Sequence, residues 1–64
     1  MRSQNESVLS RLKIGSLTPL EALHECGTLR LGARIWELRN EGYNITTRLV
    51  ERNGRRVAEY TLHP

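Results

Sequence analysis

The sequence predicts a small α+β domain in which three helices precede a C-terminal β-hairpin. Hydrophobic residues in the first part of the chain recur at helical spacing between glycines, whereas from Ile45 onward they alternate with polar residues as in a strand. The dipeptide Asn53-Gly54 adds the strongest short signal for a hairpin turn. With 64 residues the chain forms at most one domain, residues 1–64, too small for a deep pocket as well as a core.

The first helix is expected over residues 4–14. Ser3 and Glu6 have the spacing of a capping box, an apolar stripe begins at Val8, and Gly15 can end the helix.

The second helix is expected over residues 19–26. Thr18 suits the cap and Pro19 the first helical position, and Gly27 lies just past the end. We expect Leu20 and Leu23 to face inward.

The third helix is expected over residues 29–41, with Thr28 as its cap and Gly42 as its C-terminal glycine. The apolar stripe that anchors it to the core consists of Leu31, Ile35 and Leu38. Gly32 costs helix propensity, roughly 1 kcal/mol relative to alanine, which suggests that another surface approaches the backbone there.

A hairpin is expected over residues 45–62. A two-residue turn at Asn53-Gly54 sets a register in which Arg48 faces Glu59 and Glu51 faces Arg56, two opposite-charge pairs that stabilise a sheet. The face expected to cover the helices carries Ile45, Leu49, Ala58, Tyr60 and Leu62.

Basic residues are unevenly distributed. The net charge is +3, and residues 30–64 hold seven arginines and four glutamates, so the whole excess lies in the second half. Arginine suits bidentate contacts to phosphate and guanine, so a polyanionic partner is expected.

Several function classes are disfavoured. Cys26 is the only cysteine, which excludes an internal disulfide and suits a reducing cytoplasm, and the N-terminus lacks an apolar signal segment. His24 and Cys26 are two positions apart and point to different sides of a helix, so we expect no metal site. No catalytic set, cofactor site, small-molecule site or membrane span is evident, so we expect no enzyme.

Two helices joined by a tight glycine turn and followed by a basic hairpin have the layout of a winged helix-turn-helix. The runs LTPLEAL, GTLRLGARIWELRNEGY and VERNGRRVAEYTL resemble a family of small helix-turn-helix proteins that is widespread in bacteriophages and prophages. The resemblance covers about residues 8–62 and is loose before Val8, so residues 1–7 are alternatively a mobile tail. It implies a DNA-binding fold in the cytoplasm of a bacterial host.

On this basis we expect sequence-specific binding of double-stranded DNA, by a transcriptional regulator or an excisionase-like architectural factor. Dimers or cooperative arrays on DNA are plausible. The expected contacts are Thr28, Arg30, Gly32, Ala33, Arg34, Arg39, Arg52, Arg55 and Arg56. The alternative is a protein-interaction module that uses Trp36 and the outer hairpin face.

Six of these residues have competing roles. Arg52, Arg55 and Arg56 can instead form a charged hairpin tip that discourages edge-to-edge pairing with another chain. Arg34 can instead pair with Glu37 or Glu41, and Arg39 can complement the helix dipole. Trp36 either fills the gap between the third helix and the hairpin or contacts DNA or another subunit.

Overall fold

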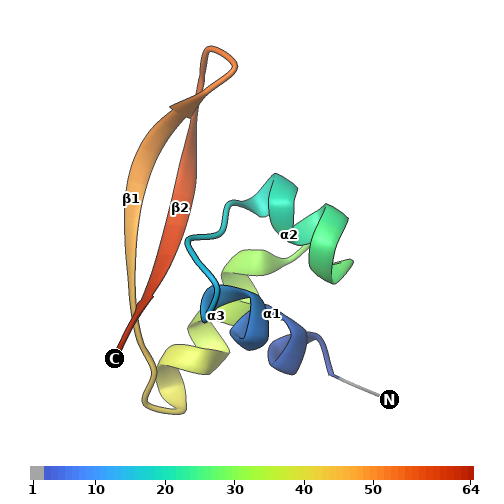
Figure 1. Ribbon diagram of the computed structural model, residues 1–64, viewed down its shortest axis with the longest axis vertical. Coiled ribbons are helices and arrows are strands. Elements are labelled where there is room, and N and C mark those ends of the chain that lie inside the picture. The colour runs from blue at the N-terminus through green and yellow to red at the C-terminus, as the bar shows by residue number, and fades with distance from the viewer. Residues whose placement is uncertain (1–2) are drawn as a thin grey trace.

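The computed structural model describes residues 3–64 and has the expected α+β architecture (Figure 1). Three helices pack together, and a long antiparallel hairpin stands beside them and extends beyond α2 at its tip. The elements in chain order are α1 (Gln4–Leu12), α2 (Pro19–Cys26), α3 (Leu31–Asn40), β1 (Asn44–Arg52) and β2 (Arg55–His63).

Capping side chains start the first two helices. The Ser3 hydroxyl accepts the Glu6 N–H at 3.1 Å, and Thr18 and Glu21 form a complete capping box. α1 ends at Leu12, two residues earlier than expected, and leaves Ile14 83% exposed. Residues 4–7 belong to α1 rather than to a tail, while the rest of the expected tail, Met1 and Arg2, lies outside the described residues.

The core lies where the helices meet the base of the hairpin. Leu17, between α1 and α2, is completely buried, and its backbone exchanges two hydrogen bonds with Tyr60 at 2.9 and 2.8 Å. This bridge adds a short third segment along the edge of β2, which the sequence did not predict. The buried hydrophobic residues are Val8, Leu12, Leu17, Ala22, Leu31, Ile35, Leu38 and Ile45.

The hairpin has the predicted register, and each strand extends one residue further from the turn than expected. Asn53 and Gly54 have φ values of 54° and 76°, as a type I′ turn requires. The expectation that Leu49 covers the helices was wrong. Ile45 is buried, but Leu49 is 67% exposed because the hairpin extends past the helices beyond its base (Figure 1).

The inward face of α2 also differs from the prediction. Leu20 and Leu23 are 60% and 38% exposed, whereas Ala22 is fully buried. Cys26, one turn further along, is half-buried and donates its S–H to the Ser7 carbonyl of α1 at 3.7 Å. The small side chains of Ala22 and Cys26 therefore lie on the inward side of α2, and the leucines are turned outward.

Candidate nucleic-acid interface

The turn between α2 and α3 is built by Gly27 and Thr28. Gly27 has φ 71°, in the left-handed region that glycine adopts at little cost, and ends α2. The Thr28 hydroxyl accepts the Arg30 N–H at 3.1 Å, which shapes the entry into α3 two residues later than expected. Thr28 is only 1% exposed. It offers almost no surface to a phosphate, so we leave it out of the proposed interface.

α3 presents one side to the core and the other to solvent. Leu31, Ile35 and Leu38 are buried as predicted. Gly32 and Trp36 are exposed, and Ala33 is partly exposed. Trp36 is 66% exposed, so it does not fill the gap between α3 and the hairpin. The outward side of α3 is therefore available for contact with another molecule.

Both arginines within α3 are engaged inside the protein. Arg34 Nη2 lies 3.1 Å from Glu37 Oε1 as an ion pair, and its side chain is only 25% exposed. Arg39 donates from Nε to the Ile45 carbonyl at 2.9 Å and from Nη2 to Thr47 Oγ1 at 2.7 Å. Arg39 thus ties α3 to β1, a role that differs from both the DNA contact and the dipole partner considered from the sequence.

Unlike Arg34, Arg30 is not held by a carboxylate in the part of the chain that the structure describes. It precedes α3, is exposed, and has φ −125° and ψ 53°, outside the helical region. Within residues 3–64, no carboxylate forms an ion pair with it.

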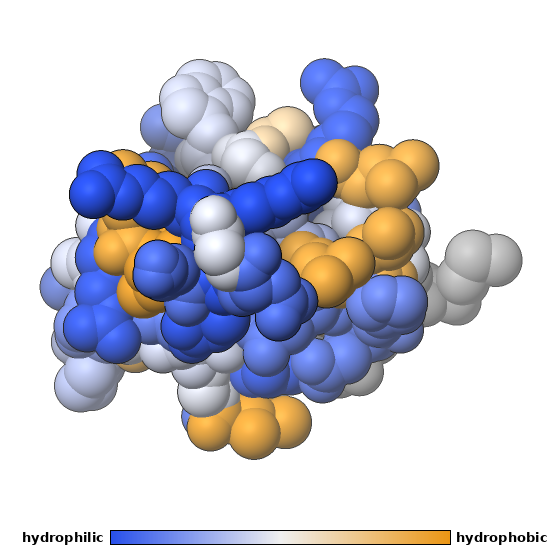
Figure 2. Space-filling model, turned by 90° about the horizontal axis from the view of Figure 1, so that it is seen from above, coloured by the Kyte–Doolittle hydropathy of each residue, from blue (hydrophilic) through white to orange (hydrophobic). Residues whose placement is uncertain are grey.

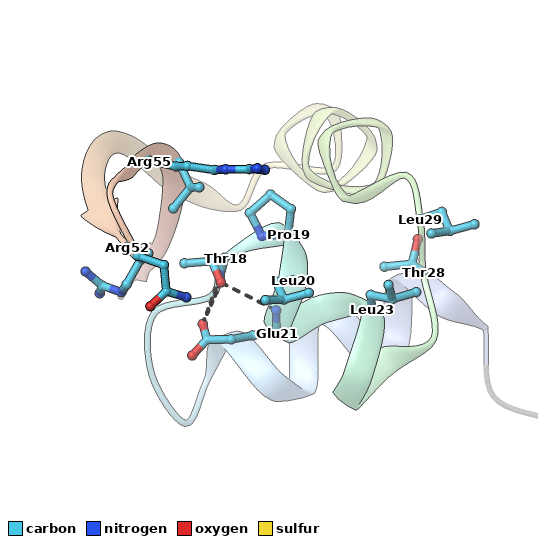
Figure 3. Close-up of a pocket in the computed structure, with 11 residues that line it drawn as sticks. Thr18, Pro19, Leu20, Glu21, Leu23, Thr28, Leu29, Arg52 and Arg55 are labelled. Atoms are coloured by element: carbon cyan, nitrogen blue, oxygen red, sulfur yellow. Dashed lines mark hydrogen bonds between the residues drawn. The ribbon is translucent and has the colours of Figure 1, made fainter.

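The hairpin tip carries three exposed arginines. Arg52 Nη2 forms an ion pair with Glu59 Oε2 at 3.1 Å and donates from Nη1 to the Glu51 carbonyl at 3.0 Å. Arg55 and Arg56 are exposed and, among the described residues, have no ion-pair partner. In Figure 3, the Arg55 side chain extends from the hairpin toward the Pro19 end of α2.

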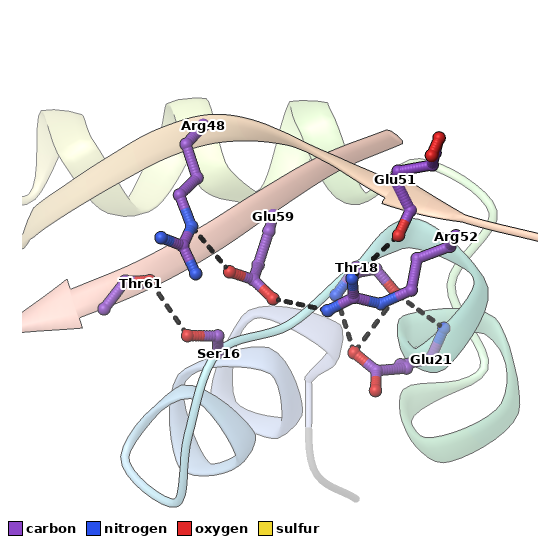
Figure 4. Close-up of polar contacts among 8 residues, drawn as sticks. All are labelled: Ser16, Thr18, Glu21, Arg48, Glu51, Arg52, Glu59 and Thr61. Atoms are coloured by element: carbon purple, nitrogen blue, oxygen red, sulfur yellow. Dashed lines mark hydrogen bonds and ion pairs between the residues drawn. The ribbon is translucent and has the colours of Figure 1, made fainter. Parts of the chain in front are cut away.

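Glu59 organises the polar side of the hairpin (Figure 4). Its side chain is 9% exposed and receives Arg48 Nε at 3.0 Å as well as Arg52. Nearby, the hydroxyls of Ser16 and Thr61 lie 2.9 Å apart and join the α1–α2 segment to β2. The register predicted the Arg48–Glu59 pair, but it did not predict that Arg52, four residues further along β1, also reaches this buried carboxylate.

An apolar groove of about 770 Å³ lies between α2 and the hairpin tip (Figure 3). Its apolar side chains include Leu20, Leu23 and Leu29, of which Leu29 is 84% exposed. Arg52 and Arg55 line its hairpin side. Figure 2, which views the molecule from the hairpin-tip end, shows hydrophilic side chains across the middle and hydrophobic ones in several places around them, including a group on the right. Sequence reasoning missed this groove because it placed two of the leucines in the core.

The structure thus separates the nine residues expected to contact DNA into two sets. Arg30, Gly32, Ala33, Arg55 and Arg56 offer exposed or partly exposed surface on the start of α3 and on the hairpin tip, and Arg52 does so while paired with Glu59. Thr28, Arg34 and Arg39 are buried or held by neighbouring groups.

Within residues 3–64, none of the helices has the length and apolar character needed to cross a membrane.

In a comparison with known families, residues 3–64 match a family described as a winged helix-turn-helix domain. No curated protein and no solved structure matched the chain significantly. The family match covers all three helices, the glycine turn and the hairpin. The chain therefore belongs to the winged helix-turn-helix domain family.

Proposed function

We propose that this protein binds double-stranded DNA, with α3 in the major groove and the hairpin tip on neighbouring phosphates. The observation that carries the proposal is a set of arginines without a carboxylate partner. Within residues 3–64, four arginines form no ion pair. Arg39 is one of them but is hydrogen-bonded to β1, which leaves Arg30, Arg55 and Arg56. These three lie at the start of α3 and at the hairpin tip, the two elements that a helix-turn-helix with a wing presents to a duplex. An unpaired guanidinium is free to bind phosphate in both its bidentate and single-contact geometries.

The test is a titration of a labelled random-sequence duplex, followed by fluorescence anisotropy at about 50 mM and about 200 mM salt. We expect affinity to fall steeply with salt, because each neutralised phosphate contributes a slope of about −0.9. Arg30→Ala, Arg55→Ala and Arg56→Ala should each reduce the slope by about 1.

Lys13→Ala is the matched control, because it removes the same charge from an exposed position just after α1. It should leave the salt slope nearly unchanged. Absence of wild-type binding at low salt would contradict the proposal, as would a control variant that weakens binding as much as the arginine variants do.

Within this proposal, the resemblance to phage and prophage proteins favours a regulator or an excisionase-like factor in a bacterial cytoplasm. A module of this size buries roughly 600–1,000 Å² on DNA, which gives weak binding by a single copy. We therefore expect two or more copies to bind side by side on repeated sites. Duplexes with one and two copies of a selected site, compared at equal site concentration, measure this cooperativity.

A second candidate function, protein binding, is favoured by the apolar groove beside α2. Leu20, Leu23 and Leu29 are exposed together along it, which is unusual for such a small surface. Binding to the leucines of this groove should depend on salt much less steeply than DNA binding does. A Leu20→Gln/Leu23→Gln variant that keeps DNA affinity but loses a partner would assign the groove to this second function.

A further inference from the structure

One stripe of α3 has no role within the protein. Gly32, Trp36 and Asn40 follow one another at four-residue intervals, so they lie along one side of the helix. All three are exposed, whereas the positions that anchor α3 are buried on another side. Trp36, at the middle of the stripe, has 66% of its surface exposed to solvent.

The glycine in this stripe is not required by the fold. Apart from the adjoining helix backbone, a Cβ at Gly32 would meet no atom within 4 Å, and the φ of Gly32 is not positive. Alanine at this position would be tolerated and would favour the helix by roughly 1 kcal/mol. A bare backbone one turn before Trp36 therefore fits the close approach of a surface outside the protein.

The chemistry of the stripe favours A·T base pairs. In the major groove, an asparagine amide pairs with N6 and N7 of adenine, and apolar side chains contact the thymine methyl group. The commonest contact to guanine uses arginine or lysine. The two arginines within α3, Arg34 and Arg39, are already engaged with Glu37 and with β1, and α3 contains no lysine. Arg30, which caps α3, is free but is assigned above to phosphate rather than to a base.

We infer that the stripe formed by Gly32, Trp36 and Asn40 reads A·T pairs in the major groove. Gly32 lets the helix approach, the indole of Trp36 packs on a thymine methyl, and the amide of Asn40 pairs with adenine. The inference rests on the proposed DNA binding and adds to it the sequence preference and the residues that set it.

The experiment uses the full chain and three duplexes of equal length. One contains A·T pairs, the second is identical except that uracil replaces thymine and so lacks the methyl group, and the third contains only G·C pairs. Trp36 is the only tryptophan, so its emission reports on this stripe alone. We expect five- to tenfold tighter binding to the A·T duplex than to the G·C duplex, about the discrimination of one good base contact.

The uracil duplex should bind more weakly than the thymine duplex and should shift Trp36 emission less. Trp36→Ala and Asn40→Ala should each reduce the A·T preference while keeping salt-sensitive binding to the G·C duplex. Ile14→Ala is the matched control, because Ile14 is a large exposed apolar residue in another part of the fold. It should keep the preference.

Other outcomes overturn the inference. Equal binding to all three duplexes with unchanged Trp36 emission would remove the base-reading role and leave the DNA-binding proposal intact. Binding to none of them at low salt would remove both. Emission that shifts with protein concentration in the absence of DNA would instead show that a second copy covers the stripe.

Discussion

At the scale of single residues, the arginines differ in their partners more than in their position along the sequence. Arg34 pairs with the carboxylate one turn away, Arg39 reaches a strand carbonyl, and Arg52 shares Glu59 with Arg48. The partly exposed Arg34–Glu37 pair contributes at most about 1 kcal/mol, but each of these contacts holds its guanidinium in place. Arginines without such partners are therefore the ones available to bind a polyanion.

Gly32 gives the clearest test at this scale. Gly32→Ala should stabilise the protein by about 0.5–1 kcal/mol, because the new methyl group meets nothing and glycine disfavours a helix. The same change should weaken DNA binding, since the methyl group would stand between α3 and the duplex. Urea unfolding and anisotropy measure the two effects separately.

Gly27→Ala is the comparison for the stability measurement. Gly27 has φ 71°, so alanine there should destabilise the turn. If Gly32→Ala proves destabilising too, the glycine is required by the fold, and the argument for close approach fails.

Cys26 gives a prediction about pH. Burial raises the pKa of the Cys26 thiol, and the neighbouring Glu25 carboxylate adds to this against the opposing effect of Arg11. Folding therefore favours the neutral thiol. The contribution of the neutral Cys26 thiol to stability is complete below the ordinary thiol pKa and is lost as pH rises through the raised pKa of the folded protein.

Iodoacetamide reacts with the thiolate, so alkylation of folded protein should reach its half-maximal rate at a higher pH than alkylation of the chain unfolded in urea. As pH rises above the ordinary thiol pKa, the Cys26→Ala variant should therefore lose less unfolding free energy than the wild type. Coincident pH midpoints for the folded and unfolded chains would contradict this account.

At the scale of secondary-structure elements, Arg39 fixes the hairpin against α3. Its two hydrogen bonds reach Ile45 and Thr47 at the base of β1, so they set where the hairpin tip lies relative to α3. Arg39→Ala should cost about 1.5–3 kcal/mol of stability, the usual range for a hydrogen bond that involves a charged group. Amide exchange in the first residues of β1 should become faster, while that in α1 should change only through the lower global stability.

The outcome for Arg39 can be separated from a DNA contact. Arg39→Lys keeps the charge but loses the forked geometry, so it should loosen β1 in the same way. If Arg39→Ala loses DNA affinity, whereas Arg39→Lys keeps it and leaves amide exchange in β1 slow, then Arg39 acts through its charge and the role assigned here is wrong.

Local chemistry predicted most elements because their signals are short-range. Thr18 with Glu21 caps α2, and Asn53-Gly54 sets the type I′ turn and with it the whole hairpin register. The ends of α1 and α3 were each misplaced by up to two residues. Helix ends depend on the contacts of the following segment, such as the bridge between Leu17 and Tyr60, which sequence periodicity does not contain.

At the scale of the whole molecule, small size makes stability responsive to binding. A domain of 64 residues is marginally stable, and its melting temperature rises by about 4–8 °C for each kcal/mol gained. Duplex present at a hundred times its Kd contributes about 2.7 kcal/mol. We therefore expect excess duplex at low salt to raise the Tm by roughly 10–20 °C.

Far-UV circular dichroism of the protein with and without duplex measures this shift. The shift should shrink as salt increases, because the affinity that produces it falls with counterion release. A shift that persists unchanged at high salt would indicate that contacts other than those to phosphate dominate binding.

The sequence by itself determined the order of the elements, the turn chemistry, the hairpin register and the excess of arginine in the second half, since each depends on neighbouring residues or on composition. Only the tertiary structure decided which side of α2 faces the core, because Ala22 is buried there and Cys26 contacts the Ser7 carbonyl of α1, while Leu20 and Leu23 are turned outward. It also decided which arginines stay free and left Trp36 exposed, since both depend on groups brought together from distant parts of the chain.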